Sequence, residues 1–271
     1  MELILLGTGN ALCTRCYNTC FYLRTPGGAI LVDGGGGNGI FRQLHRARIA
    51  VEQLHHVFLT HCHTDHILGV VWLIRRISPM ILKGRFTPPL IIHCHDEAAA
   101  ALRTMCRMMM SEKMCAAIDD TIILHQLTDG EQFAVDDMVF TAFDIHSTKI
   151  KQYGFQAVLP DGQRLVCLGD EPYNEANERW VRGCDWLLCE AFCLWSDRQR
   201  FNPYEKHHST ALDAGRLAQA VEAKHLVLYH TEDTRLSERR PTYTAEAAQH
   251  FTGIIHVPDD LERIRLRESD Q

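Results

Sequence analysis

The chain has 271 residues, of which 46% are hydrophobic and 23% are charged, so it can bury a core the size of a large domain. This composition excludes a disordered chain, a collagen and a coiled coil. With 28 Lys and Arg against 34 Asp and Glu, the net charge is −6 and no long run of one sign occurs, which argues against a general nucleic-acid coat protein.

Neither a membrane span nor a secretion signal is expected. The most apolar stretch, residues 67–74, is far shorter than the roughly 20 residues that cross a membrane. Residues 1–6 lack the basic start and long apolar run of a signal sequence, and they already predict a strand. We therefore expect a cytoplasmic protein without membrane contact.

Cysteine and histidine are used differently in this chain. The 11 Cys are scattered and odd in number, so most are predicted to be small buried hydrophobic residues rather than a disulfide scaffold. Cys13, Cys16 and Cys20 form a C-x2-C-x3-C cluster, for which a zinc or iron–sulfur role stays open although no second pair stands at zinc-ribbon spacing. The 16 His are numerous, and several have the spacing of metal ligands.

Strands and helices alternate in a pattern that predicts a single mixed α/β domain over residues 1–271. The predicted strands cover residues 2–6, 29–32, 57–60, 90–93, 121–125, 138–144, 154–159, 165–168, 186–189 and 226–229. The predicted helices cover residues 67–77, 96–110, 174–182, 209–223 and 244–251. The Met-rich segment 105–114 is interpreted as core filling, with a substrate lid as the alternative.

The densest group of metal-binding residue types lies where the predicted strand 57–60 meets the predicted helix 67–77. It contains His61, His63, Asp65 and His66. Alternate side chains of an extended segment share a face, so His61 and His63 can converge on one cation. Asp65 and His66 project from the start of the helix toward a second position. Imidazole and carboxylate are the ligands that Zn²⁺ prefers and that Mn²⁺ or Fe²⁺ tolerates.

Three further candidates each follow a predicted strand. They are His146, Asp170 and His230. A charge or an imidazole at such a place is costly to bury without a partner, so together these residues match a site for two metal ions. Asp170 is of the type that bridges two cations. Asp33, which ends the strand 29–32 beside four glycines, is expected to support the histidine loop by hydrogen bonding.

The residues His61-x-His63-x-Asp65-His66, His146, Asp170 and His230, in this order, resemble the metallo-β-lactamase superfamily of dinuclear metallohydrolases. The resemblance implies a four-layer αββα sandwich of two mixed sheets flanked by helices. It also implies that His61, His63 and His146 hold one metal, that Asp65, His66 and His230 hold the other, and that Asp170 bridges both.

The second half of the chain is similar to the ribonuclease Z-like phosphodiesterase branch of that superfamily. The similarity rests on Leu187-Leu188-Cys189-Glu190-Ala191, His208-Ser209-Thr210 and the strand before His230, with Gly7-Thr8-Gly9 and Arg15-x2-Asn18-Thr19 near the start. It implies that Glu190 orients His208 for proton transfer. In the mechanism that we expect, Asp65 accepts a proton in addition to binding the second metal. Thr210 and Asp213 also fit a plain capping box at a helix start.

One feature of ribonuclease Z is missing. A long tRNA-gripping arm is commonly inserted there after the position of His146, but in this chain a single hairpin, turned at Pro160-Asp161-Gly162, fills the interval to Asp170. The only adjacent basic residues are pairs such as Arg75-Arg76 and Arg239-Arg240. Tight binding of a large folded RNA is therefore not expected.

These features predict a dinuclear metal-dependent phosphodiesterase, with Zn²⁺ as the expected metal, that acts through a metal-bridging hydroxide. The expected substrate is a small or flexible phosphodiester: a cyclic nucleotide, a dinucleotide or a short RNA end. The alternatives are a tRNA 3′-processing endonuclease without its arm, a lactone, thioester or sulfate-ester hydrolase, and a non-catalytic metal-binding module. A homodimer is compatible with the sequence. His93 and His95 are interpreted as structural, and Asp96-Glu97 as the acidic first turn of a helix.

Overall fold

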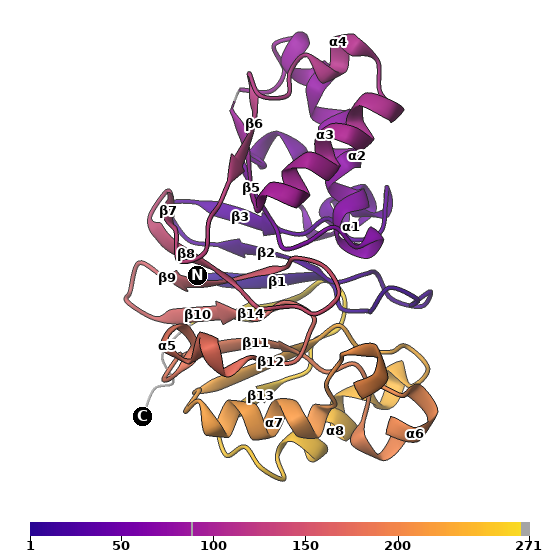
Figure 1. Cartoon of the computed structure of the whole chain (residues 1–271), viewed down its shortest axis with the longest axis vertical. Helices are drawn as coiled ribbons and strands as arrows, with labels where there is room; N and C mark the ends of the chain where they lie inside the picture. The colour runs from indigo at the N-terminus through magenta and orange to yellow at the C-terminus, as the bar shows by residue number, and fades with distance from the viewer. Residues whose placement is uncertain (88, 267–271) are drawn as a thin grey trace. The chain divides into compact units, whose positions relative to one another are not determined.

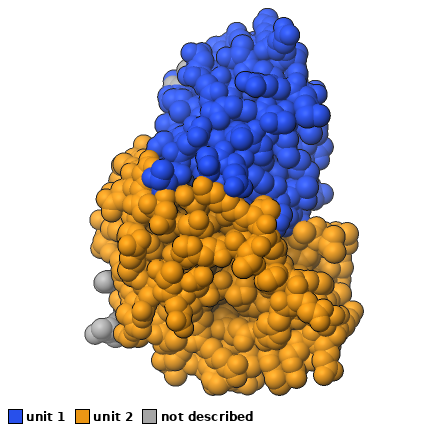
Figure 2. All heavy atoms as spheres, viewed as in Figure 1, with its two compact units in different colours: residues 1–7, 17–128, 260–271 blue, residues 8–16, 129–259 orange. Residues whose placement is uncertain are grey.

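The computed structural model describes residues 1–87 and 89–266, and the chain divides into two compact units (Figures 1 and 2). Unit 1 is formed by Met1–Gly7, Tyr17–Thr128 and the segment from Asp260 onward. Unit 2 is formed by Thr8–Cys16 and Asp129–Asp259. That residues 1–271 form a single domain stays a prediction.

Unit 1 contains a seven-stranded mixed sheet. Its spatial order is β14 (Glu262–Arg265), β1 (Glu2–Gly7), β2 (Cys20–Arg24), β3 (Ala29–Val32), β4 (His56–Leu59), β5 (Leu90–Cys94) and β6 (Ile122–Gln126). The pairs from β14 to β3 are antiparallel, and β3, β4, β5 and β6 are parallel. The three parallel pairs need crossovers, which α1 (Gly39–Ala47), α2 (Thr64–Leu82) and α3 (Asp96–Met109) with α4 (Glu112–Cys115) supply.

The core of unit 1 lies between this sheet and its helices. Alternate residues of the parallel strands, such as Val57, Leu59 and Ile92, are fully buried against apolar side chains of α1, α2 and α3. Phe58, on the opposite face of β4, is also fully buried, so this strand appears in the sequence as a continuous apolar run, and polar residues begin only where it ends.

Unit 2 contains a second seven-stranded mixed sheet. Its order is β13 (Ile254–His256), β12 (His225–Tyr229), β11 (Trp186–Glu190), β10 (Arg164–Cys167), β9 (Tyr153–Val158), β8 (Met138–Asp144) and β7 (Gln132–Val135). β10, β11, β12 and β13 are parallel, and the remaining pairs are antiparallel. The helices of this unit are α5 (Glu178–Val181), α6 (Arg198–Phe201), α7 (Ala211–Ala220) and α8 (Leu236–Ala247). Short 3₁₀ helices span Glu175–Asn177, Trp195–Asp197 and Tyr204–Lys206 in this unit, and Val51–Gln53 in unit 1.

The predicted fold class is confirmed: the chain is α/β, with two mixed sheets flanked by helices. All ten predicted strands exist. Several helix boundaries are corrected. α2 runs from Thr64 past Pro79 to Leu82, without the one backbone hydrogen bond that Pro79 cannot donate, and α8 runs from Leu236 to Ala247 and contains Pro241. The predicted helix 174–182 is a 3₁₀ helix over Glu175–Asn177 followed by α5.

The Met-rich segment is only partly a core element. Met105 and Met110 pack against the core of unit 1, but Met108 and Met109 of α3 are 80% and 57% exposed, so the core interpretation is wrong for these two. Among the described residues, no helix combines the length and the apolar character that crossing a membrane requires.

Candidate metal centre

In unit 1, the predicted histidine motif forms the loop from β4 into α2. His63 is the extended residue that precedes α2, and Asp65 and His66 lie in the first turn of that helix. Nε2 of His61 lies 2.9 Å from Nδ1 of His63, and Nε2 of His66 lies 3.4 Å from Oδ2 of Asp65. His61, Asp65 and His66 are buried, and the rings of His61 and His66 are 4.1 Å apart. The loop thus gathers three imidazoles and a carboxylate within unit 1.

Asp33 supports this loop, as the sequence predicts. Its carboxylate accepts hydrogen bonds from the backbone N–H and the hydroxyl of Thr60, both at 2.8 Å, and its Oδ2 lies 2.7 Å from Nδ1 of His66. The hydroxyl of Thr60 is in turn 2.9 Å from Nδ1 of His61. A carboxylate can only accept, so Nδ1 of His66 carries the hydrogen and its Nε2 is left as the metal-binding atom.

Glycines allow the loop after β3 to lie directly against the start of α2. A Cβ atom on Gly69 would be 1.8 Å from the carbonyl oxygen of Gly34, and the backbone N–H of Gly34 donates to the carbonyl of His66 at 2.9 Å. The hydroxyl of Tyr17 fixes the same loop by donating to the carbonyl of Gly34. This close contact holds Asp33 within hydrogen-bonding distance of His66 in the first turn of α2.

In unit 2, the predicted site residues lie at the ends of three adjacent parallel strands. Asp170 follows β10, Glu190 ends β11 and His230 follows β12. The carboxyl ends of parallel strands meet at one edge of a sheet, and that edge is where ligands bind in open α/β sheets. Oδ2 of Asp170 lies 3.4 Å from Nε2 of His230, and Oε2 of Glu190 lies 3.7 Å from Nδ1 of His230.

Asp170 is held by a buried glutamine that no sequence motif reveals. Nε2 of Gln152 donates to Oδ1 of Asp170 at 2.6 Å, and the backbone N–H of Asp170 donates to Oε1 of Gln152 at 3.0 Å. Below this pair the hydroxyl of Tyr229 donates to the carbonyl of Gly169, and burial raises the pKa of Tyr229 well above its ordinary value. Tyr229 is therefore a neutral structural donor.

Glu190 and His208 form the pair that the ribonuclease Z resemblance implies. Nδ1 of His208 lies 2.8 Å from Oε2 of Glu190 and 2.9 Å from the carbonyl oxygen of Asp170. Since both neighbours are acceptors, Nδ1 carries the hydrogen, and Nε2 remains for a substrate. Phe192 stacks on the His208 ring at 4.8 Å and fixes its plane. The capping box of Thr210 and Asp213 is also present, so the helix start and the pair coexist.

His146 and His207, the remaining residues considered from the sequence, lie outside the groups described above. His146 follows β8 but is exposed, and the donor groups found in the described part of the chain do not include it. His207 contacts Thr148 at 3.1 Å, as a neighbour of the pair rather than a part of it. Glu171, which the sequence reading missed, binds the loop after His146 by accepting from the hydroxyl of Ser147 at 2.8 Å.

His93 and His95 occupy structural positions. His95 caps α3 by accepting from the backbone N–H of Ala98 at 3.3 Å, and α3 starts at Asp96 as predicted. Nε2 of His93 lies 3.1 Å from Nδ1 of His56, and Nδ1 of His93 lies 2.9 Å from Nδ1 of His125. Burial first, and then the charge of these two neighbours, lowers the pKa of His93 to about 3, so His93 is neutral.

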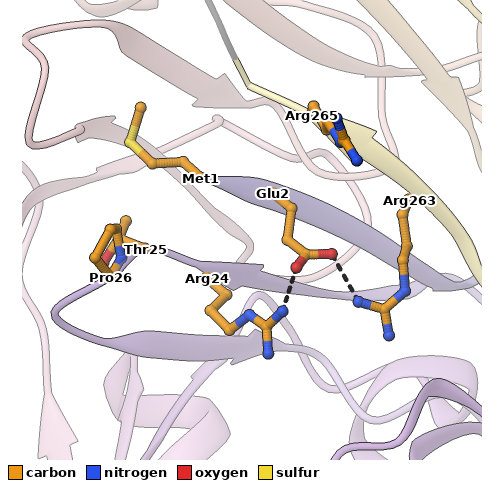
Figure 3. Close-up of a pocket in the computed structure, with 7 residues that line it drawn as sticks. All are labelled: Met1, Glu2, Arg24, Thr25, Pro26, Arg263 and Arg265. Atoms are coloured by element: carbon orange, nitrogen blue, oxygen red, sulfur yellow. Dashed lines mark hydrogen bonds and ion pairs between the residues drawn. The ribbon is translucent and has the colours of Figure 1, made fainter.

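The basic residues also differ from the sequence reading. Arg239 is buried and binds the hydroxyls of Thr8 and Thr231, so it does not belong to an exposed basic pair. Arg24, Arg263 and Arg265 gather around Glu2 in a pocket of about 690 Å³ on unit 1 (Figure 3). The pocket lies at the amino end of β1, whereas the histidine loop follows the carboxyl end of the parallel strand β4, so the two are at opposite ends of the sheet.

The donor chemistry of both units fits a divalent metal. In unit 1 two imidazole nitrogens lie 2.9 Å apart, close to the separation of two ligands on one small cation, and Asp33 fixes the metal-binding tautomer of His66. In unit 2 a carboxylate and an imidazole lie side by side at the ends of adjacent strands. Cys62 stands between His61 and His63, but burial raises its pKa to about 11, so it stays a thiol.

Comparisons with known proteins agree with this chemistry. A family model described as "Anti-Pycsar protein Apyc1" matches residues 1–252. The ribonuclease Z of Streptomyces avermitilis is 27% identical over 307 aligned positions, which cover 97% of each chain. The metallo-β-lactamase fold protein YhfI from Bacillus subtilis has a TM-score of 0.77 at 18% identity, covering 97% of this chain and 98% of its own. The short form of human tRNase Z has a TM-score of 0.72 at 21% identity, covering 98% and 100%.

The predicted resemblance is confirmed: the chain is similar to ribonuclease Z over 97% of its length, and it shares the fold of the metallo-β-lactamase fold protein YhfI and of tRNase Z. The alignment with the Streptomyces protein spans 307 positions, more than the 271 residues of this chain. That protein therefore carries inserted residues that this chain lacks, in agreement with the missing arm.

Proposed function

This chain belongs to the Anti-Pycsar protein Apyc1 family, and from this membership and the donor chemistry of its two units we propose that it is a dinuclear metal-dependent phosphodiesterase. The proposed substrate is a small or flexible phosphodiester: a cyclic nucleotide, a dinucleotide or a short RNA end. The observation that carries the proposal is the Glu190–His208 pair beside Asp170 and His230, because it adds a positioned proton donor to metal-binding residues.

The proposed ligand assignment follows the superfamily pattern and the order of the donors along the chain. Two Zn²⁺ ions would be held, one by His61, His63 and His146 and the other by Asp65, His66 and His230, and Asp170 would serve both. Such ions, when bound, lower the pKa of a water molecule toward 7 and neutralise charge on phosphoryl oxygens. Asp65 is assigned a second role as acceptor of the proton that this water loses.

His208 acts on the leaving oxygen. Its Nδ1–H is occupied by Glu190 and the carbonyl of Asp170, so only Nε2 can exchange a proton with a substrate. The buried carboxylate of Glu190 orients the ring, and Phe192 stacks on it and keeps it from turning. General acid catalysis of this kind contributes about 10²- to 10⁴-fold to a rate.

The single short hairpin between His146 and Asp170, in place of an arm, supports a small substrate over a folded RNA. Arg239 is engaged in buried hydrogen bonds. The arginine cluster around Glu2 lies at the end of the unit 1 sheet opposite to the histidine loop. Phosphate contacts from Lys and Arg supply most of the affinity for a folded nucleic acid. A cyclic or short phosphodiester needs few such contacts.

The first experiment measures hydrolysis of bis(p-nitrophenyl) phosphate and of a matched carboxylic ester by metal-depleted protein supplied with Zn²⁺, Mn²⁺ or Fe²⁺. We expect phosphodiester cleavage that needs the added metal, nearly complete loss of activity and of bound metal in His63→Ala, and loss of about 10²-fold or more in His208→Ala. His250→Ala is the control, because this exposed histidine lies outside the donor groups. Cleavage of the ester alone, under every metal, would refute the proposal.

The second experiment separates the substrates. Cyclic nucleotides, dinucleotides, short RNAs and a precursor tRNA are incubated with the active metal form, and kcat/KM is compared. We expect the highest values among the small phosphodiesters. Selective cleavage of the precursor tRNA at its 3′ end would instead identify an endonuclease without the usual arm. Bound metal without turnover of any substrate would identify a non-catalytic module.

A further inference from the structure

A second group of metal-binding side chains lies in unit 2, outside the residues assigned to the proposed phosphodiesterase site. Cys13, Cys16 and Asp233 each offer a ligand atom, and these atoms all lie within 4.8 Å of one another. All three residues are half-buried. Cys20, the third cysteine of the sequence cluster, is instead buried in the core of unit 1 and does not belong to this group.

The loop that carries the two cysteines is shaped around them. A Cβ atom on Gly9 would lie 2.6 Å from Sγ of Cys16 and 2.9 Å from Sγ of Cys13, so both sulfur atoms sit against bare backbone. The thiol of Cys13 donates to the carbonyl oxygen of Thr231 at 3.1 Å. Only glycine at position 9 leaves room for two sulfur atoms on that side.

Asp233 is oriented toward the pair by the backbone between the cysteines. The N–H groups of Thr14 and Arg15 both donate to its Oδ2, at 2.7 and 2.8 Å. A metal would therefore take its bond from Oδ1. The guanidinium of Arg15 donates to the carbonyls of Asp233 and Thr234, which ties the cysteine loop to the segment that carries this carboxylate.

Without a cation this arrangement is unfavourable for ionised thiols. The hydrogen bond between the two thiols, followed by burial, raises the pKa of Cys13 far above its ordinary value. A bound metal reverses that preference because it stabilises thiolates outright. Two thiolates and a carboxylate, with a fourth position for water, form a tetrahedral set suited to Zn²⁺.

We propose that Cys13, Cys16 and Asp233 bind a zinc ion, distinct from the two metals of the proposed phosphodiesterase site. The proposal rests on this cluster alone and does not need the proposed function. The ion joins the loop Thr8–Cys16 to the segment after β12, where Gly9 bridges Thr231 and the N–H of Thr231 donates to the carbonyl of Thr8 at 3.0 Å. Thr231 is the neighbour of His230, so the ion would stabilise the position of that ligand.

The test uses the full chain, kept reduced with a phosphine and loaded with Co²⁺ or Zn²⁺. Thiolate ligands give cobalt a charge-transfer band in the near ultraviolet, which histidine and carboxylate ligands do not. We expect this band in the wild type and its loss in Cys13→Ser/Cys16→Ser, together with the loss of one zinc per chain by elemental analysis. Cys115→Ser is the control, because Cys115 is a half-buried cysteine of unit 1 outside the group.

Two more variants keep the result interpretable if the double variant folds poorly. Asp233→Asn should retain the band and bind cobalt more weakly, and His61→Ala should retain the band while losing metal from the histidine loop. Absence of the band in the folded wild type, or an intact mass showing that the two cysteines have formed a disulfide under these conditions, would overturn the proposal. Phosphodiester cleavage by a protein that lacks the charge-transfer band would refute only the zinc proposal. The band in a protein that cleaves no phosphodiester would refute only the proposed function.

Discussion

Replacement of Asp33 with Asn is the most direct test of how the histidine loop is prepared for a metal. Asp33 is 3% exposed and accepts three hydrogen bonds, two from Thr60 and one from Nδ1 of His66. Asparagine has the same shape, but one of its two acceptors becomes an NH₂ donor. If the amide oxygen keeps the bond from the backbone of Thr60, the NH₂ group faces His66.

The tautomer of His66 then changes. An NH₂ group at the position of Oδ2 can bond to Nδ1 of His66 only if Nδ1 loses its hydrogen, which moves that hydrogen to Nε2, the atom assigned to the metal. Substitutions of such supporting residues weaken metal binding by about 10- to 100-fold, which corresponds to about 1.4–2.7 kcal/mol. We expect zinc affinity in Asp33→Asn to fall by this factor while the fold is retained.

The assay is a competition titration of zinc against a chelator of known affinity, with a thermal melt of the metal-free protein alongside. Asp185→Asn is the matched control: its carboxylate accepts from the backbone N–H of Arg164 at 2.7 Å, and it precedes β11, at the end of that strand opposite to Glu190. Unchanged zinc affinity in a folded Asp33→Asn protein would refute the tautomer argument, and an equal loss in Asp185→Asn would show that the effect is not local.

Three other substitutions test separate parts of the structure. Burial lowers the pKa of His93 to about 3, whereas its pKa in the unfolded chain is about 6.5. Between these two pH values the unfolded chain binds one more proton than the folded chain, so the free energy of unfolding decreases as the pH falls. His93→Phe should reduce this pH dependence, measured by urea unfolding, by up to about 1.4 kcal/mol per pH unit. Glu190→Gln should lower kcat by about 10²-fold with little change in KM for bis(p-nitrophenyl) phosphate, because the carboxylate that orients His208 is lost; an unchanged kcat would contradict that role. Gly69→Ala should destabilise the protein by about 1–3 kcal/mol or more in thermal melts, since the new Cβ would lie 1.8 Å from a carbonyl oxygen; a wild-type melt would show that the contact is not tight.

The fold and the ends of its parallel strands were predictable because they follow from local patterns. A strand buried against helices reads as a short apolar run, and the first polar residue after it marks the sheet edge. Asp33, Asp170 and His230 each occupy such a position, and the hydrogen bonds that the sequence predicts for Asp33 exist. The histidine motif was readable because all its donors lie in one loop.

Contacts between distant segments were not predictable. Gln152 binds Asp170 from 18 residues away, and Asp233 binds the backbone of Arg15 from 218 residues away. Neither Gln152 nor Asp233 belongs to a motif, since an amide or a carboxylate in a loop is common and only the fold decides what it faces. The start of α8 was missed for a different reason, because Pro241 predicts a break that the folded chain tolerates.

Backbone conformation gives an independent reason to regard the strand ends as functional. Asp33, His146 and His230 have φ angles of 57°, 60° and 57°, in the left-handed region that glycine adopts without cost. Each comes at or just after the end of a strand, where a glycine would make the turn more cheaply. A non-glycine residue there costs about 1–2 kcal/mol, and at two of the three positions the side chain makes contacts that glycine lacks. For Asp33 this is the set of bonds to Thr60 and His66, and for His230 it is the imidazole between Asp170 and Glu190. His146 adopts the same conformation, and there Asp144 accepts a hydrogen bond from its backbone N–H.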